Sequence, residues 1–249
     1  MAIYKKISGT WERLVHWKKI SGTWKRLKIL KKISGTWYVI SGKPFIQLPS
    51  GGYDSGDYVD FGTRFAPSED GYYEIKIKTP STIDKKYCLF FMMTNTMLTN
   101  GGAVGLHILA DNKLEFKIIQ GGGSTVTFTS SNTVEADTKY TIKIDLTNAT
   151  STVTVNGTSW GTFSRLTFTP NTVAYYPEFK VGSNQYSNGN TFEGKIYYMN
   201  FKGQNTSGVT EEGIYEMYFD IGTTTVKDSY IADDAQNGTI VGGNVVEEE

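Results

Sequence analysis

The chain has 249 residues but only one cysteine, two histidines and six prolines. A single thiol, Cys88, excludes a disulfide within the chain and a metal cluster built on several cysteines. Its neighbours in the run 87–93 are apolar, which predicts a buried and unreactive side chain. No apolar run approaches the roughly 18 residues of a membrane-spanning helix. The N-terminus also lacks the apolar core of a secretory signal. We therefore expect neither a membrane span nor a secretory route.

Groups that could catalyse a reaction are scarce as well. His16 lies near the N-terminus, and His107 lies in an apolar stretch that predicts a core or cleft position. The glycines at 121–123 are followed neither by a helix pattern nor by Lys-Ser or Lys-Thr, so they predict a hairpin turn and not a phosphate loop. No strand pattern places two carboxylates close together on one face, as glycoside hydrolysis requires. The sequence therefore predicts that the protein is not an enzyme.

Glycine and aromatic residues, in contrast, are abundant, with 27 Gly, 16 Tyr and 13 Phe. Apolar and polar residues alternate over 73–78, 113–118 and 139–146, which predicts strands with one buried face. Asn156-Gly157 is a strong hairpin-turn signal. Candidates for long helices are almost absent. This pattern predicts an all-β protein, an antiparallel jelly-roll sandwich.

One heptapeptide, Lys-Lys-Ile-Ser-Gly-Thr-Trp, occurs three times at a constant spacing of 13 residues. Ser-Gly favours a hairpin turn, and the flanking Ile, Thr and Trp favour strands. The repeat therefore predicts a β-meander with strands over 11–20, 24–33 and 37–40. A cationic amphipathic helix is the alternative, because Trp24, Leu27 and Leu30 have helical spacing. Ser-Gly would interrupt such a helix at every repeat.

Charge divides the chain into two parts. Residues 1–43 carry eleven Lys/Arg and one acid, whereas residues 44–249 carry fourteen Lys/Arg and 24 acids. A short meander cannot bury a core of its own, so we expect the basic arm to bind other copies of itself or an acidic surface. Nucleic acid is a further possible partner of the basic arm, but the rigid spacing favours assembly. The residues expected to mediate attachment are the repeat tryptophans, the turn glycines and the repeat lysines: Trp11, Trp24, Trp37, Gly9, Gly22, Gly35, Lys18, Lys19, Lys31 and Lys32.

The triplicated Ile-Ser-Gly-Thr-Trp resembles short repeats near the N-terminus of bacteriophage virion proteins. The resemblance covers about 37 residues. It implies a virion protein, assembled in the host cytoplasm, that contacts other virion proteins and forms a homo-oligomer. The turn-rich residues 41–57 separate the repeats from the rest of the chain. We predict an arm over 1–43, a linker over 44–57 and a jelly-roll domain over 58–249.

Several motifs in the body resemble concanavalin A-like and laminin G-like jelly rolls. They are Tyr-Val-Asp-Phe-Gly at 58–62, the segment 109–114, Val-Thr-Val-Asn-Gly at 153–157, and Thr-Phe-Glu-Gly-Lys-Ile-Tyr-Tyr at 191–198. The segments 218–229 and 237–243 resemble a part that many members carry at the start of the domain. Here they come last, which implies a permuted order or a generic match. We expect no cofactor. The resemblance leaves calcium as the alternative, with Asp220 and Asp228 as candidate ligands.

Sugar binding requires aromatic faces beside amide groups, and one stretch of the body is rich in both. The candidate carbohydrate-binding residues are Trp160, Tyr175, Tyr176, Asn184, Tyr186 and Asn188. Alternatively, Tyr175 and Tyr176 pack beneath a loop that ends at Pro177. The sequence-based prediction is a bacteriophage fibre, tail or capsid-decoration protein whose repeats attach it and whose lectin-like domain binds a host-surface glycan. The alternatives are a purely structural virion protein and a bacterial surface adhesion module.

Overall fold

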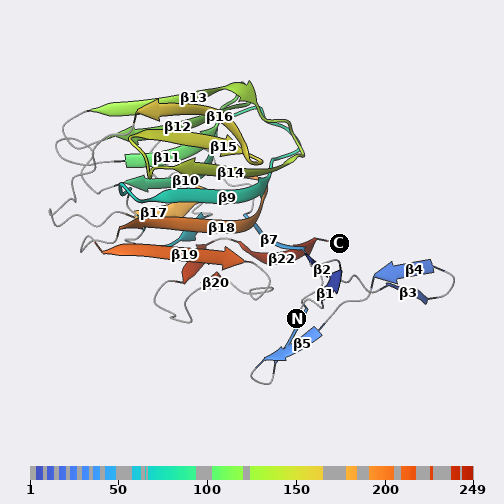
Figure 1. Cartoon of the computed structure of the whole chain (residues 1–249). Coiled ribbons are helices and arrows are strands. Elements are labelled where there is room, and N and C mark those ends of the chain that lie inside the picture. The colour runs from blue at the N-terminus through green and yellow to red at the C-terminus, as the bar shows by residue number, and fades with distance from the viewer. Residues whose placement is uncertain are drawn as a thin grey trace.

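The computed structural model contains a sandwich of two antiparallel sheets and three short hairpins (Figure 1). The structure describes residues 4–7, 10–13, 17–20, 23–26, 30–33, 36–39, 43–48, 58–62, 65, 67–93, 103–119, 124–164, 178–183, 191–204, 209–216, 225–226, 237–241 and 243–248. Every regular element among these residues is a strand, which confirms the all-β prediction. No helix in the described part of the chain has the length and hydropathy to cross a membrane.

Two sheets of eight strands form the layers, and they are called here the front and the back sheet, as they lie in Figure 1. The front sheet has the order β16 (Thr158–Ser164), β15 (Thr150–Val155), β14 (Lys139–Asp145), β9 (Tyr72–Lys78), β18 (Lys195–Gln204), β7 (Lys43–Gln47) and β22 (Asn244–Glu248), with β19 (Thr210–Glu216) also paired to β18. The back sheet has the order β13 (Thr125–Thr133), β12 (Lys113–Ile119), β11 (Ala103–Ile108), β10 (Tyr87–Met93), β17 (Glu178–Val181), β8 (Tyr58–Asp60), β21 (Gly238–Val241) and β20 (Thr225–Val226).

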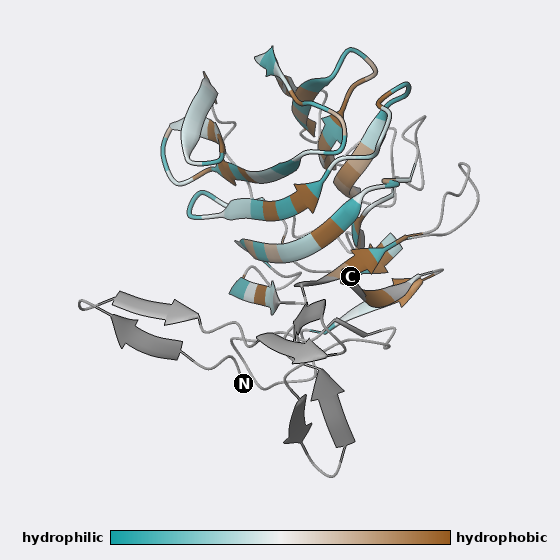
Figure 2. Cartoon of the chain, turned by 90° about the vertical axis from the view of Figure 1, so that its right-hand side faces the viewer, coloured by the Kyte–Doolittle hydropathy of each residue, from teal (hydrophilic) through white to brown (hydrophobic). Residues whose placement is uncertain are grey.

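The alternating pattern of the sequence sets which residues face the core. On β9, Ile75 and Ile77 are fully buried while Lys76 is exposed. The same alternation runs along β12 and β14. Figure 2 shows hydrophobic and hydrophilic residues following one another along the strands. A strand has a side-chain period of two, so one face of each sheet becomes apolar and the two apolar faces pack together.

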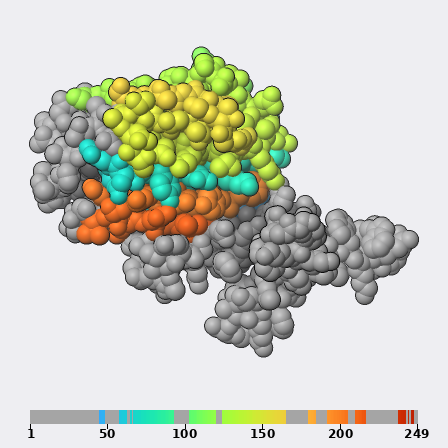
Figure 3. Space-filling view, in the orientation of Figure 1, coloured from blue at the N-terminus to red at the C-terminus, as the bar shows by residue number. Residues whose placement is uncertain are grey.

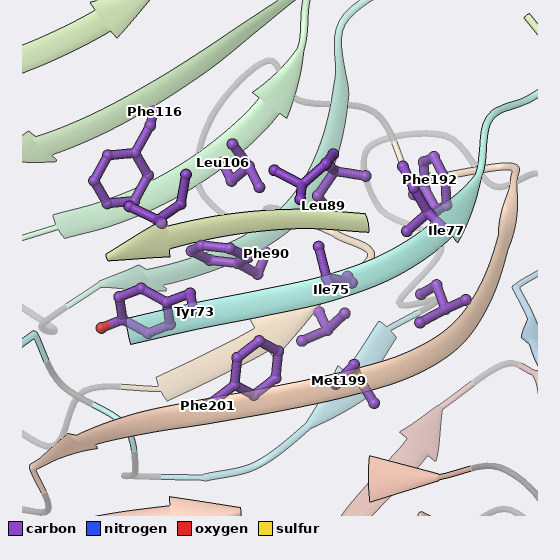
Figure 4. Packing of buried hydrophobic residues seen from close by; sticks show 14 of the residues in the cluster. Tyr73, Ile75, Ile77, Leu89, Phe90, Leu106, Phe116, Phe192, Met199 and Phe201 are labelled. Carbon is purple, nitrogen blue, oxygen red and sulfur yellow. The ribbon is translucent and has the colours of Figure 1, made fainter. Parts of the chain in front are cut away.

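Aromatic rings fill the space between the sheets (Figure 4). Phe179 from the back sheet and Phe201 from the front sheet meet edge to face, with ring centroids 4.9 Å apart. Tyr73 stacks on Phe179, and its hydroxyl donates a hydrogen bond to the carbonyl oxygen of Phe65 at 2.7 Å. Burial of such large apolar surfaces is the main stabilising contribution to folding.

The turn between β15 and β16 is the one that the sequence predicts. Asn156 and Gly157 both have positive φ, 51° and 79°, as a two-residue type I′ turn requires. The Asn156 side-chain oxygen accepts a hydrogen bond from the backbone N–H of Thr141 at 2.8 Å. This contact joins the turn to the neighbouring strand β14.

Part of the segment expected to be a linker is a strand of the sandwich. β7 pairs with β18 on one side and with β22 on the other. Phe45, Ile46 and Leu48 are buried, because this short apolar run completes the front sheet. The expected linker residues 49–57 lie outside the described residues. Near the other end of the chain, β21 pairs with β8 in the back sheet, so residues 238–241 lie beside residues 58–60.

The three repeats form separate hairpins and not one meander. β1 (Tyr4–Ile7) pairs with β2 (Thr10–Arg13), β3 (Trp17–Ile20) with β4 (Thr23–Arg26), and β5 (Leu30–Ile33) with β6 (Thr36–Val39). Each pair is a two-stranded sheet in which the Lys-Lys-Ile segment of a repeat faces the Thr-Trp segment of the same repeat. Pairing within one repeat closes only a short loop, whose entropic cost is small.

Candidate ligand-binding face

The outer face of the back sheet is defined by the residues of β11 that point away from the core. On β11, Val104, Leu106 and Ile108 point into the core and are buried. Because side chains alternate along a strand, the residues between them point away from the core. These residues are Ala103, Gly105 and His107. The face that they share with β8, β10, β12, β13, β17 and β21 is called here the ligand face.

Strand register aligns the side chains of the ligand face in two rows across the sheet. The longer row crosses seven strands and the shorter row crosses four. Their members are, in spatial order, Thr239, Asp60, Lys180, Phe91, Gly105, Lys117 and Thr127, and then Cys88, His107, Glu115 and Thr129. The rows bring together residues that are distant in sequence.

Gly105 lets two rings approach the centre of this face. A Cβ atom at position 105 would lie 2.9 Å from both His107 Cε1 and Phe91 Cδ2, closer than such contacts allow. The rings of Phe91 and His107 have centroids 6.4 Å apart and are tilted against each other. A side chain at position 105 would therefore push these rings apart.

His107 is a buried polar group on the outer side of the sheet. The residue is 4% exposed. Within the part of the chain that the structure describes, neither Nδ1 nor Nε2 has a hydrogen-bond partner. The nearest carboxylate oxygen, Glu115 Oε1, lies 3.8 Å from Nδ1, too far for a hydrogen bond. Unpartnered buried polar groups are costly and therefore uncommon, which marks this imidazole as a functional candidate.

Burial and two lysines keep His107 neutral. Removal from water disfavours the imidazolium and is the largest effect. The ammonium groups of Lys86 and Lys117 add repulsion, and together these effects lower the pKa of His107 to about 3. A neutral imidazole has one N–H donor and one acceptor nitrogen. It can therefore both donate and accept a hydrogen bond.

Charged side chains surround the imidazole. Lys86 Nζ lies 2.7 Å from Glu115 Oε1 and holds that carboxylate. Lys117 follows Glu115 by two residues on β12 and lies opposite Gly105 on β11. At the other side of Phe91, the buried Lys180 places its ammonium 4.5 Å from the ring centroid of Tyr58. The face thus combines two aromatic rings with hydrogen-bonding groups, which is the composition of a polar ligand site.

The outer face of the front sheet differs from the ligand face because its polar side chains bond to one another. Figure 3 shows this face, with β9 in cyan and β18 and β19 in orange. The Tyr72 hydroxyl donates a hydrogen bond to Asn200 Oδ1 at 3.1 Å and also bonds the Glu212 carboxylate. Lys143 lies 5.0 Å from the ring centroid of Tyr72 and 3.1 Å from an oxygen of Asp145. These partners leave fewer groups for a ligand on the front sheet.

Cys88 is fully buried, as the sequence predicts, although its register places it opposite His107 on the ligand face. Burial raises the pKa of its thiol, which disfavours the reactive thiolate. Among the described residues, no group of three His, Cys, Asp or Glu side chains could hold a metal ion. The calcium candidates Asp220 and Asp228 lie outside the described residues.

The expected sugar-binding cluster is only partly within the described chain. Trp160 lies on β16, is partly buried against the core, and meets Tyr140 edge to face at 6.4 Å. It is therefore a packing residue at the border of the core and does not belong to the ligand face. The other expected members, namely Tyr175, Tyr176, Asn184, Tyr186 and Asn188, lie outside the described residues.

For the residues expected to mediate attachment, the structure describes the strand register of the tryptophans and lysines but not the glycines. Register sets Trp11, Trp24 and Trp37 opposite Lys6, Lys19 and Lys32, one pair in each hairpin. Lys18 and Lys31 lie on the first strands of the second and third hairpins. Gly9, Gly22 and Gly35 lie outside the described residues.

Phe91, Glu115 and Lys117 are ligand-face residues that the sequence does not single out. Alternation shows only that Glu115 and Lys117 lie on a polar face. One signal was present, since Gly105 and His107 alternate with Val104, Leu106 and Ile108 in an otherwise apolar strand. A small residue and a polar residue at alternate positions of this strand indicate that its second face does not pack into the hydrophobic core.

The sandwich is similar to solved structures of lectin-like jelly rolls. A candidate carbohydrate-binding protein from Bacteroides ovatus is 14% identical, with a TM-score of 0.55, over 91% of this chain and 67% of that chain. Domains LG4-5 of the mouse laminin alpha1 chain are 11% identical, with a TM-score of 0.48, over 76% of this chain and half of that one (50%). A pentraxin from Limulus polyphemus is 12% identical, with a TM-score of 0.46, over 64% and 75% of the two chains.

No protein-family model and no curated protein matches the chain. The similarity to the Bacteroides ovatus protein, together with the two antiparallel sheets, establishes the fold as a lectin-like jelly roll.

Proposed function

We propose that this chain is a carbohydrate-binding protein that holds its ligand on the ligand face of the back sheet. The observation that carries the proposal is His107, a buried imidazole on the outer side of a sheet with two unpartnered nitrogens in the described chain. One sugar hydroxyl can accept from the N–H of the ring, and a second hydroxyl can donate to its other nitrogen. The similarity in fold to the Bacteroides ovatus protein supports the same class of ligand.

Binding fits these residues better than catalysis does. The outward positions of β11 are Ala103, Gly105 and His107, none of which is a carboxylate. The neighbouring carboxylate of Glu115 is held by Lys86 at 2.7 Å. A glycosidase requires a second carboxyl group within about 5 to 10 Å of the first, on the same face. We therefore propose a binding role without hydrolysis.

A glycan array probed with the full chain tests this function. Phe91→Ala removes an aromatic contact from the ligand face, and Tyr72→Ala removes one from the front sheet as the matched control. We expect Phe91→Ala to weaken glycan binding by about tenfold or more, which corresponds to about 1.4 kcal/mol. Tyr72→Ala should retain binding. The opposite pattern would assign the ligand to the front sheet, and absence of binding to any glycan would refute the function.

We also propose that the repeats attach or oligomerise the protein, in a bacteriophage virion. Three hairpins with identical register and a basic composition support a surface that repeats along the arm. Light scattering of the full chain beside residues 43–249, at low and high salt, tests this role. We expect a larger assembly only for the full chain, and less of it at high salt because charge attraction is screened. In a phage that encodes the protein, deletion of residues 1–42 should abolish virion incorporation.

A further inference from the structure

The charges on the ligand face do not cancel. Lys86 is paired with Glu115 at 2.7 Å, and Lys113 is paired with Asp111 at 3.1 Å. Lys117 differs from both, because no carboxylate within the described chain lies in ion-pair distance of its ammonium. Among the described residues, it therefore contributes a positive charge that has no ion-pair partner.

Lys117 lies on β12, between β11 and the edge strand β13 of the back sheet. Register places it directly beside Gly105, which in turn lies beside Phe91. The next row holds His107 and Glu115 in the same two strands. Lys86 Nζ lies 2.7 Å from Glu115 Oε1, and the same oxygen lies 3.8 Å from His107 Nδ1. The neutral ring therefore shares this part of the face with two lysines.

We infer that the ligand is an acidic carbohydrate, whose carboxylate or sulfate binds Lys117 while its hydroxyl groups bind His107. This inference rests on the proposed glycan-binding function and specifies its ligand. The anionic group of the ligand supplies the negatively charged partner that Lys117 lacks among the described residues. The Phe91 ring provides an apolar surface for the sugar. The Lys86–Glu115 pair remains intact and borders the site.

Physical chemistry favours this ligand over a neutral one. Hydrogen bonds between an ammonium and an anionic oxygen are about twice as strong as neutral ones. A ligand that brings only hydroxyl groups would leave the charge of Lys117 uncompensated. Attraction at a partly buried site is also less screened by salt than at an open surface. The acidic group should therefore decide affinity, and the hydroxyl contacts should decide orientation.

The test compares matched glycans on the full chain. Each set contains a neutral oligosaccharide together with its sialylated, its uronic acid and its sulfated derivative. We expect acidic members to bind at least about tenfold more tightly than the neutral member, or about 1.4 kcal/mol. The sialylated and uronic acid arms report on a carboxylate ligand, and the sulfated arm reports on a sulfate.

Three variants separate the role of Lys117 from a general effect of charge. Lys117→Gln should weaken the binding of acidic members by about tenfold and so abolish the preference for them. Lys117→Arg keeps the charge and should retain the preference. Lys76→Gln removes an exposed lysine from the front sheet and is the matched control, which should also retain it.

Equal binding of neutral and acidic members would overturn the inference but leave the glycan-binding function standing. The same would follow if Lys117→Gln and Lys76→Gln reduced the preference equally. Absence of binding to every glycan would refute both proposals. The outcomes therefore distinguish an error in the ligand class from an error in the function.

Discussion

His107 shows how a fold changes the chemistry of one side chain. In an unfolded chain, an imidazole titrates near neutral pH, at a pKa of 6.5. In the folded chain it lies beside Cys88 and Glu115 in register, nearly out of contact with water, and its pKa falls to about 3. The fold thus keeps a neutral donor and acceptor available over the whole range in which free histidine would change its charge.

This pKa difference makes folding stability depend on pH. Between about pH 6.5 and pH 3 the unfolded state binds a proton at His107 that the folded state does not. The free energy of unfolding should therefore fall as the pH falls through this window, by at most about 1.4 kcal/mol per pH unit. Urea denaturation of the native chain and of His107→Asn measures the effect, because other titrating groups are common to both.

The advantage of the native chain over His107→Asn should shrink steadily as the pH is lowered from 7 to 4. A difference that stays constant over this range would show that His107 is protonated equally in the folded and unfolded states. Such a result would contradict the burial of the imidazole.

At the scale of elements, the hairpin β15–β16 depends on two residues with positive φ. Gly157 has a φ of 79°, and a Cβ atom built there would meet nothing within 4 Å. The cost of a side chain at this position is therefore conformational and not steric. The turn also carries Asn156, whose contact with Thr141 ties the hairpin to β14.

Gly157→Ala should lower the free energy of unfolding by about 1 kcal/mol, because an L-residue with a side chain disfavours the left-handed region. The measurement is the urea midpoint. Ser159→Ala, at an exposed position on the same hairpin, is the control and should leave the midpoint nearly unchanged. An unchanged midpoint for Gly157→Ala would mean that the turn does not hold this conformation in solution.

Strands could be predicted from the sequence where one face of the strand is exposed to solvent. The strands β9, β12 and β14 were predicted from alternation because their lysines, glutamates and threonines mark the solvent side. It failed at β7, because Phe45 and Ile46 stand between the turn signals Gly-Lys-Pro and Pro-Ser-Gly. The ligand face was not predicted, since it arises from register between strands. Cys88, His107 and Glu115 are neighbours only after β10, β11 and β12 have paired.

At the scale of the whole molecule, a chain of zero formal charge divides into a basic arm and an acidic body. The boundary between them lies at β7, which follows the last hairpin and belongs to the front sheet. Pairing with both β18 and β22 makes β7 an integral part of the sandwich. The arm is therefore joined to the body at a strand in the interior of a sheet.

A pair of truncations tests this boundary. Residues 43–249 retain β7 and should melt at the same temperature as the full chain. Residues 49–249 lack β7, which unpairs β22 and removes the buried side chains of Phe45, Ile46 and Leu48. Each such loss typically costs about 2 to 5 kcal/mol, so this chain should melt far lower or fail to fold. Circular dichroism during heating measures both, and equal melting temperatures would contradict the place of β7 in the sheet.

The position of β7 also determines how the molecule would bear a mechanical load. A tension between an anchored arm and a held ligand would enter the sandwich at Lys43 and leave it through the back sheet. Because β7 pairs with β22 along its whole length and with β18 at Ile46 and Gln47, a pull along the strand loads both ladders in shear. An edge strand pulled from its end would peel away one bond at a time. A tether at an interior strand would therefore withstand a larger force than a tether at an edge strand.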